Sequence, residues 1–508
     1  MPGGRGWSWS RISRRRATPR SSRISSRRPS ARMRHMKKSL ALLALTLAAQ
    51  AFAQAPQAPG DTERYTLFQA PFTLLRDAQL FDGSGGAPRE HMSVLIRDGR
   101  IASVAPDAEL KAPAGALVKD LAGAALMPGF VLLHEHLFYP TERGSYGAFF
   151  QSFPLLYLAA GVTTLRTAGS MSPYADLNTW KDIREGKAVG PDMDVTAPFL
   201  NGIQAFVAQV PRLASAEDAV RQVGYWADVG ATSYKGYMHL TREQLGAIVK
   251  AAHERKAKVT AHLCAVTYAE AAGMGIDNLE HGFFASSDFV DGKQADACPS
   301  GDAVPRSLDA LATDDPRMAA LQRELIDRKV ALTSTLTVFE TFSHGRPMAP
   351  TAALDLLMPQ LREQYVARYT AIQRGGPNVY GRVLPKDMAW EKQFADAGGL
   401  LVAGTDPTGY GGVIPGYSSL RQFELLREAG FDAAATVKIM TANGATYLGR
   451  GADIGRIAPG LRADLIAFAA PLDAAKPALP EVAWTMKTGR AWDRAKILNA
   501  WKGQVGLR

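Results

Sequence analysis

The stretch "MPGFVLLHEHLFYP" contains two histidines, His134 and His136, at the end of an apolar run over residues 126–133. This run has the composition of a buried β-strand. Residues i and i+2 of a strand point to the same side, so we expect both imidazoles to face one point. Neutral imidazoles are common zinc ligands, which makes the pair a candidate metal site. A single His-x-His is a weak signal by itself.

Four further candidate groups stand at the ends of separate short apolar segments: Lys235, His262, His281 and Asp406. Imidazole and carboxylate ligands suit Zn²⁺ with one coordination position left for water. Each residue also has an ordinary structural explanation. Lys235 can extend to solvent, the histidines can be satisfied in the core or at a strand end, and Asp406 can begin a turn before Pro407. Their common position at strand ends favours a shared site.

Eight apolar segments rich in β-branched residues follow one another along the chain, and helical patterns separate them. In the clearest helix, residues 241–256, Thr241 and Gln244 predict a capping box. This alternation predicts an α/β fold, a (β/α)₈ TIM barrel over residues 126–451. In such barrels catalytic groups lie at the C-terminal strand ends. The predicted strands are residues 126–136, 161–169, 194–200, 231–237, 258–263, 278–283, 330–337 and 400–406.

The motifs "HEH", "SYKGY", "AHL", "LEHG" and "GTDP" on the first, fourth, fifth, sixth and eighth strands resemble those of the amidohydrolase superfamily of metal-dependent hydrolases. Secreted members related to imidazolonepropionases and Xaa-Pro dipeptidases are the most similar. The resemblance covers nearly all of the chain beyond residue 65. "ADIGRIAPGLRADLIAF" (452–468) is similar to the segment that completes a small β-domain in this family. The resemblance thus implies a β-sandwich formed by residues 65–125 and 452–508.

The resemblance also implies a dinuclear site, with zinc as the expected metal and other divalent metals as alternatives. In the members that this chain resembles, the strand-4 lysine reacts with CO₂ to give a carbamate that bridges the metals together with a hydroxide. Asp406 would act as the catalytic general base and acid. The implied ligands are His134, His136 and Asp406 for one metal, His262 and His281 for the other, and carboxylated Lys235 between them.

Four residues are candidates for binding substrate. Tyr237 lies on the same side of its strand as Lys235 and could donate to an oxyanion or to a substrate carboxylate, as a tyrosine of related peptidases does. Arg166 could pair with a substrate carboxylate or form a salt bridge inside the barrel. Relatives often have Asp after this arginine, where this chain has Thr167. His239 and His344 follow the fourth and seventh strands and could reach substrate or lie in solvated loops.

Three functions are compatible with these residues. The first is a dinuclear hydrolase of an amide or peptide bond, such as that of a dipeptide or an N-acyl amino acid. The second is a mononuclear deaminase or a hydrolase of cyclic amides or lactones on the same barrel. The third is a metal-stabilised binding protein, which the presence of both Lys235 and Asp406 disfavours. The first is preferred because mononuclear relatives usually lack a ligating lysine on strand 4.

The net charge of +11 is confined to the N-terminal segment. Residues 1–38 contain 13 basic and no acidic residues, and without them 46 basic face 48 acidic residues. Nucleic-acid binding therefore has no support. We expect residues 1–35 to be a disordered leader and residues 36–53 a signal peptide cleaved near Ala53, with export to the periplasm or the extracellular space. We expect a small-molecule substrate and no stable membrane anchor, and the sequence leaves homo-oligomerisation open.

Two cysteines, Cys264 and Cys298, are too few for a disulfide scaffold. Export would permit one bridge between them, and two buried thiols are an equally good alternative. The irregular stretches 284–305 and 341–350 follow the sixth and seventh strands. We expect these stretches to overhang the mouth of the active site.

Overall fold

The computed structural model describes residues 60–506, except for 143–144, 205–206 and 409–411. The expected leader (1–35) and signal peptide (36–53) lie outside the described residues. Within the described part of the chain, no helix is long and apolar enough to cross a membrane.

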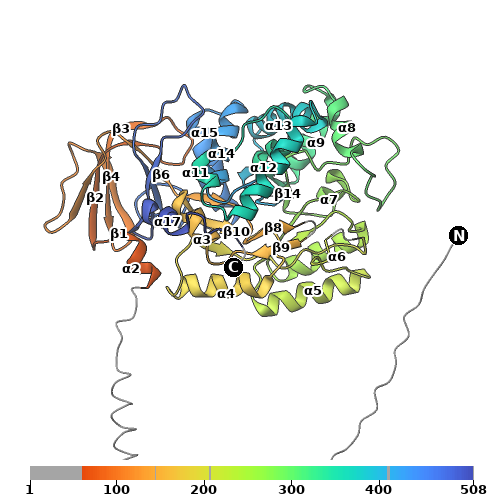
Figure 1. The fold of residues 1–508 in the computed structure, drawn as a ribbon, viewed down its shortest axis with the longest axis horizontal. Coiled ribbons are helices and arrows are strands. Elements are labelled where there is room, and N and C mark those ends of the chain that lie inside the picture. The colour runs from red at the N-terminus through yellow and green to blue at the C-terminus, as the bar shows by residue number, and fades with distance from the viewer. Residues whose placement is uncertain (1–59, 143–144, 205–206, 409–411, 507–508) are drawn as a thin grey trace, which may run out of the picture. The chain divides into compact units, whose positions relative to one another are not determined.

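A nine-stranded sheet joins the two ends of the described chain. Its strands are β1 (Thr66–Phe68), β2 (Phe72–Leu80), β3 (Arg89–Arg97), β4 (Arg100–Pro106), β5 (Leu117–Asp120), β6 (Ala125–Pro128), β17 (Leu465–Phe468), β18 (Val482–Lys487) and β19 (Arg490–Asp493). Their order is β1-β19-β18-β17-β6-β2-β3-β4, with β5 paired to β2. In Figure 1 the orange N-terminal strands thus adjoin blue C-terminal ones. Both segments predicted for the small β-domain contribute to this sheet, and its arrangement as a sandwich stays a prediction.

The apolar run predicted as a single strand over residues 126–136 is divided between two sheets. β6 pairs with β17, whereas β7 (Phe130–Leu132) pairs with the parallel strand β10. The division occurs at Gly129, where a Cβ atom would lie only 2.2 Å from Oγ1 of Thr163. Only glycine allows the chain to pass this close to β10. His134 follows two residues after β7, so this crossing places it.

Eight short parallel strands form the layer that supports the site. They are β7, β10 (Val162–Arg166), β11 (Asp192–Asp194), β12 (Ser233–Gly236), β13 (Lys258–Ala261), β14 (Asn278–Glu280), β15 (Ala331–Ser334) and β16 (Leu401–Ala403). They form two sheets, β11-β10-β7 and β12-β13-β14-β15-β16. A parallel bridge between Thr196 and Ser233 links the sheets on one side. On the other side the Leu133 amide donates to the Ala403 carbonyl at 2.8 Å. Each predicted segment contains or overlaps one of these strands, which confirms the α/β class.

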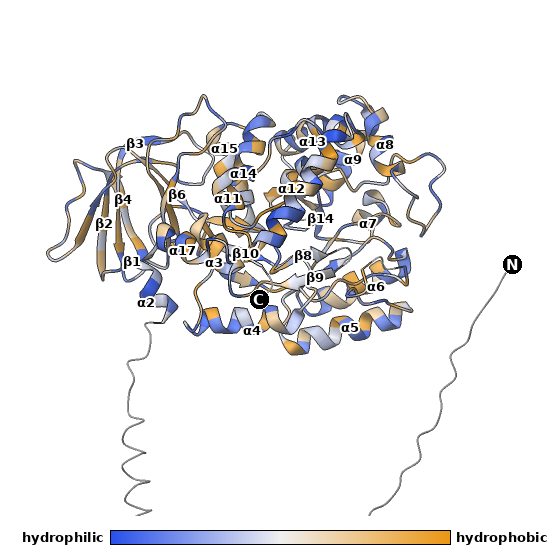
Figure 2. Ribbon diagram, viewed as in Figure 1, coloured by the Kyte–Doolittle hydropathy of each residue, from blue (hydrophilic) through white to orange (hydrophobic). Residues whose placement is uncertain are grey.

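Helices separate the parallel strands and carry both hydrophobic and hydrophilic residues, as α4–α6 show in Figure 2. The predicted capping box of α6 is present, since Thr241 and Gln244 bond each other's backbone amides. The helices are α2 (Asp61–Tyr65), α3 (Phe153–Ala159), α4 (Pro173–Arg184), α5 (Ala216–Val229), α6 (Arg242–Glu254), α7 (Tyr268–Gly273), α8 (Ala303–Ala310), α9 (Pro316–Asp327), α10 (Leu336–Phe342), α11 (Thr351–Leu354), α12 (Pro359–Arg374), α13 (Val379–Asp396), α14 (Tyr417–Glu428), α15 (Ala433–Lys438), the π-helix η1 (Ile439–Asn443), α16 (Gly444–Tyr447) and α17 (Arg494–Trp501). A hairpin of β8 (Phe138–Glu142) and β9 (Ser145–Ala148) follows β7.

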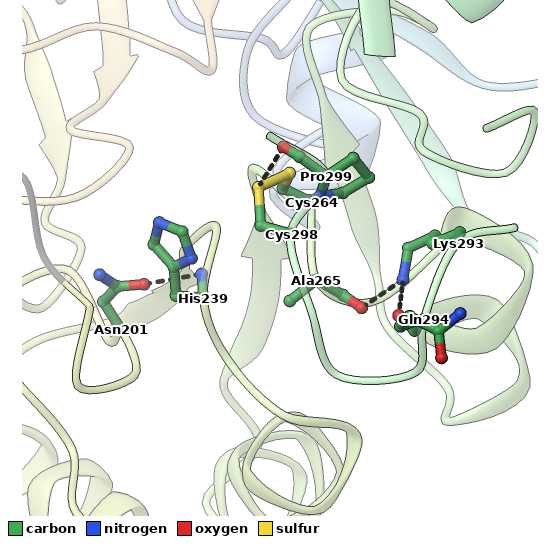
Figure 3. Close-up of a disulfide and its surroundings, with 8 residues drawn as sticks. All are labelled: Asn201, His239, Cys264, Ala265, Lys293, Gln294, Cys298 and Pro299. Atoms are coloured by element: carbon green, nitrogen blue, oxygen red, sulfur yellow. Dashed lines mark hydrogen bonds between the residues drawn. A yellow bond between two sulfur atoms is a disulfide. The ribbon is translucent and has the colours of Figure 1, made fainter. Parts of the chain in front are cut away.

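Cys264 and Cys298 form a disulfide with their Cα atoms 4.8 Å apart (Figure 3). The bond joins the chain after β13 to the long segment after β14. Lys293 of that segment donates to the Ala265 carbonyl at 2.6 Å, and Asp296 accepts from Nε of Arg242 at 3.1 Å. The pairing that the sequence left open is therefore present, and it fixes a segment that we expected to overhang the site.

Replacing both cysteines with serine should lower the apparent free energy of unfolding by about 3–4 kcal/mol, because the bond closes a loop of 34 residues. Denaturant titration of oxidised protein measures this change. A reductant should shift the wild type to the midpoint of the variant and leave the variant unaffected. Equal midpoints for oxidised wild type and variant would contradict the prediction.

Candidate metal centre and catalytic site

The predicted ligands come together at the C-terminal ends of the parallel strands. His134 and His136 follow β7, Lys235 lies in β12, and His281 and Asp406 follow β14 and β16. Asp406 approaches His134 because its amide and that of Thr405 both donate to the His134 carbonyl, at 2.9 and 3.0 Å. Gly404 permits this approach, since a Cβ atom there would lie 2.3 Å from Cβ of His134.

Asp406 is the centre of the cluster. Its Oδ1 lies 3.1 Å from Nε2 of His136 and 3.4 Å from Nε2 of His134, and its Oδ2 lies 3.9 Å from Nδ1 of His281. Possible ligand atoms of His134, His281 and Asp406 all lie within 4.8 Å of one another. Lys235 Nζ lies 3.5 Å from Nε2 of His134. These side chains are almost fully buried.

His262 adjoins this group without belonging to its most compact part. Its imidazole is half-buried and lies 4.4 Å from the imidazole of His281 and 5.1 Å from the ring of Tyr237, measured between ring centres. The structure therefore brings all six predicted ligands to one end of the parallel strands. His134, His281 and Asp406 form the compact set of donors in the described residues.

The protonation of His136 shows that the donor set suits a cation. Nδ1 of His136 faces the Gly169 carbonyl at 3.1 Å, and a carbonyl can only accept, so this nitrogen carries a proton. Burial lowers the pKa of His136 to about 4, so the imidazole is neutral at neutral pH. Its Nε2 then presents a lone pair to the Asp406 carboxylate. Two acceptors at this distance repel each other unless a proton or a metal cation lies between them, and imidazole with carboxylate is a typical zinc donor set.

Glu280 is a site residue that our sequence analysis did not identify. Its Oε2 accepts from Nδ1 of His134 at 2.7 Å, and its Oε1 accepts from Arg166 at 2.6 Å and from the Thr260 hydroxyl. Burial alone would raise the pKa of Glu280, but Lys235, His134 and Arg166 together outweigh burial and hold it well below its usual value. The carboxylate therefore fixes the proton of His134 on Nδ1 and leaves Nε2 free as a ligand.

Arg166 lies inside the protein behind the histidines. Its side chain is 1% exposed, its Nε donates to the Leu133 carbonyl at 2.7 Å, and its guanidinium lies over the ring of Tyr447. The structure thus shows the internal salt bridge, with Glu280, that the sequence had left open beside a substrate-binding role. The sequence feature that could have predicted the pairing of Arg166 with Glu280 is the acidic residue inside the apolar strand "NLEHGF".

Glu135, between the two histidines, points away from them and is fully buried. Its Oε2 accepts from the Thr405 hydroxyl at 2.5 Å. Burial raises the pKa of Glu135 to about 8, which favours a neutral carboxylic acid. This orientation agrees with the strand alternation that placed His134 and His136 on a common side. Glu135 thereby helps to fix the segment that carries Asp406.

The other proposed substrate-binding residues lie around the site at different depths. The Tyr237 ring packs against His262 and lies 5.0 Å from the Phe199 ring. His239 follows β12, and its amide donates to Oδ1 of Asn201 at 2.9 Å (Figure 3). His344 follows α10, and its amide lies near Asn378. Neither His239 nor His344 belongs to the compact ligand group found within the described ranges.

Residues 125–492 match the family profile described as the amidohydrolase family. Among solved structures, the chain is similar to a candidate prolidase from Bifidobacterium longum, with 24% identity, a TM-score of 0.61, and coverage of 85% of this chain and 100% of that one. It is also similar to a Xaa-Pro dipeptidase with bound methionine in the active site, with 17% identity, a TM-score of 0.62, and coverage of 83% and 100%. At these identities the likeness to solved structures concerns the fold alone.

A short stretch of the chain is also similar to the dihydroorotase of Mycobacterium tuberculosis. Over 87 residues the two are 36% identical, and the match spans 17% of this chain and 19% of that enzyme. The chain therefore matches about a fifth of the length of this curated relative.

Replacing Glu280 with Gln should destabilise the protein by about 3 kcal/mol, because Arg166 is then left as a buried charge without an ionised partner. Metal affinity should fall about 10- to 100-fold, since a partner of a metal-binding histidine is altered. Denaturant titration and competition with a chelator measure the two effects.

The matched control for this change is Glu324→Gln, which removes an exposed ion pair with Arg328 and should change neither quantity measurably. Wild-type stability and metal affinity in Glu280→Gln would show that this carboxylate does not support the site.

Proposed function

Because this chain belongs to the amidohydrolase family and is a hydrolase that acts on carbon–nitrogen bonds, we propose that it is a dinuclear metal enzyme that cleaves an amide or peptide bond. A dipeptide or an N-acyl amino acid is the proposed substrate class. The observation that carries this proposal is the buried contact between Asp406 and the lone pair of His136, which a cation would stabilise.

Lys235 has the surroundings that carboxylation requires. It is 1% exposed, and burial lowers the pKa of its amine to about 8, so a neutral amine is available near neutral pH. The nitrogen lone pair of a neutral amine can form a bond to the carbon of CO₂, and the nitrogen releases one proton to give a carbamate anion. Such an anion offers two oxygens, one for each of two metals. We propose that His134, His136, His262 and His281 complete the ligand set with Asp406.

The metals, Asp406 and Tyr237 would each have a separate role in the hydrolysis. When bound, the metals would lower the pKa of a water molecule and polarise the scissile carbonyl. Asp406 would take the proton of the attacking water and deliver it to the leaving nitrogen. Tyr237 would orient the substrate beside His262.

We propose that the eight parallel strands close into one (β/α)₈ barrel, with the nine-stranded sheet forming the small β-sandwich. The backbone contacts between Thr196 and Ser233, and between Leu133 and Ala403, support closure on both sides. We also propose export to the periplasm or the extracellular space. The disulfide supports this compartment, because such bonds persist under oxidising conditions.

The second candidate is a mononuclear deaminase or a hydrolase of a cyclic amide or lactone, and the short stretch shared with a dihydroorotase favours the cyclic amide among these substrates. The two candidates differ in product. We expect release of a free amino acid from dipeptides or N-acyl amino acids when these are offered together with lactones, cyclic amides and aminopurines. Amino-acid analysis measures this release. Opening of a cyclic amide, or ammonia release from a heterocycle, without amino-acid release would favour the mononuclear alternative.

Replacing Lys235 with Ala should lower bound metal from two equivalents toward one or none and reduce the rate by several orders of magnitude, because the bridging ligand is lost. Lys235→Arg should fail too, since a guanidinium stays protonated and cannot be carboxylated. Acetate or propionate should restore part of the activity of Lys235→Ala by replacing the carbamate. Elemental analysis and a hydrolysis assay measure these changes.

The control for this series is Lys250→Ala, which removes an exposed lysine from α6. It should leave metal content and rate unchanged. Near-normal metal content and activity in Lys235→Ala would contradict the dinuclear site.

A further inference from the structure

Two acidic side chains of α13, Asp387 and Glu391, lie one helical turn apart and are buried behind the site, at 1% and 0% exposure. Three of their four carboxyl oxygens, Oδ2 of Asp387 and both of Glu391, have no hydrogen-bond partner among the described residues. Neither side chain has an ion pair in the described ranges. Buried polar atoms normally have partners, so this arrangement requires an explanation.

The two carboxyls meet at Gly282. A Cβ atom on Gly282 would lie 2.3 Å from Oε1 of Glu391 and 2.7 Å from Oδ2 of Asp387, which places these two oxygens within 5.0 Å of each other. Two carboxylates this close and shielded from water cannot both be ionised. A proton held between Oδ2 of Asp387 and Oε1 of Glu391 would give these two of the three unpartnered oxygens a hydrogen bond.

Among the residues that the structure describes, no positively charged group compensates the pair. The other titratable group that faces it is Tyr268 of α7, and Ser334 of β15 adds a hydroxyl. Burial raises the pKa of Asp387 to about 8 and that of Glu391 well above its usual value, which agrees with retention of a proton at neutral pH.

The pair supports the turn that carries His281. His281 and Gly282 both have left-handed backbone conformations, with φ of 75° and 55°, and this conformation is rare for histidine. Asp387 Oδ1 accepts from the Phe283 amide at 2.8 Å, and the Gly282 amide donates to the Thr333 carbonyl at 2.9 Å. These bonds hold the turn in the conformation that directs His281 toward Asp406.

We propose that Asp387 and Glu391 share a proton and act together as positioning residues for His281, thereby setting the metal affinity of the site. The pair lies outside the ligand set and contacts the backbone next to His281. The part of this proposal that concerns metal rests on the proposed function, whereas the shared proton can be tested independently of metal.

The first test compares Asp387→Asn with Asp387→Ala. Asn retains an acceptor for the Phe283 amide and a donor for Glu391, so metal affinity should stay within about threefold of the wild type. Ala removes the acceptor, so affinity should fall at least about tenfold, as for other residues that support metal ligands. Competition with a chelator measures affinity, and the absorption spectrum of the cobalt-substituted protein reports ligand geometry. The control is Asp396→Asn, an exposed carboxyl of the same helix.

The second test does not require Asp387→Ala to fold. Infrared spectroscopy above pH 7 should show stronger C=O absorption of protonated carboxylic acid in the wild type than in Glu391→Gln, where Glu135 still contributes to this band. Absence of this difference would overturn the shared proton. Equal metal affinity in Asp387→Ala, Asp387→Asn and wild type would overturn the positioning role while leaving the proposed function intact. A wild-type protein that binds no metal would overturn the proposed function together with the positioning role.

Discussion

The candidate site is organised around a crowding of hydrogen-bond acceptors in a region that excludes water. Asp406 is held as a carboxylate against the imidazoles of His134 and His136, whose free nitrogens present lone pairs to it. In water such groups would separate or be solvated, but the strands fix their positions. A cation is the natural partner for this arrangement. The residues around the site hold these acceptors close together.

This support acts through a hydrogen bond at Nδ1 of each of three imidazoles. Glu280 contacts Nδ1 of His134, the Gly169 carbonyl contacts Nδ1 of His136, and the Thr335 hydroxyl contacts Nδ1 of His281. These contacts orient the rings and leave the opposite nitrogens of His134 and His136 toward Asp406. Such partners are as much part of a metal site as its ligands, because they determine which nitrogen carries a proton.

The interior stabilises its acidic groups in two different ways. Glu280 remains ionised because the Arg166 guanidinium pairs with it and His134 and the Thr260 hydroxyl donate hydrogen bonds to it. Asp387 and Glu391 have no such partner among the described residues, and a neutral, protonated form is the alternative to separation. Negative charge is therefore retained at Glu280, where a positive partner is in contact with it, and is avoided behind the turn of His281.

The sequence by itself determined the features that depend on local spacing. Neighbouring residues fix three such features. They are the positions of the parallel strands along the chain, the capping box of α6, and the common side of His134 and His136. The family motifs supplied the ligand candidates at the strand ends. These predictions needed no knowledge of which distant segments touch.

Tertiary structure alone decided the contacts between residues far apart in the chain. His134 and Glu280 are 146 residues apart, and Phe283 and Asp387 are 104 apart. The internal pairing of Arg166 and the disulfide of Cys264 with Cys298 were open alternatives for the same reason. A side chain's type shows what it can bond, but packing of the parallel strands and α13 determines which partner lies within reach. Burial then determines whether that side chain is ionised. Its access to water and its distance from opposite charges are defined only in the folded chain.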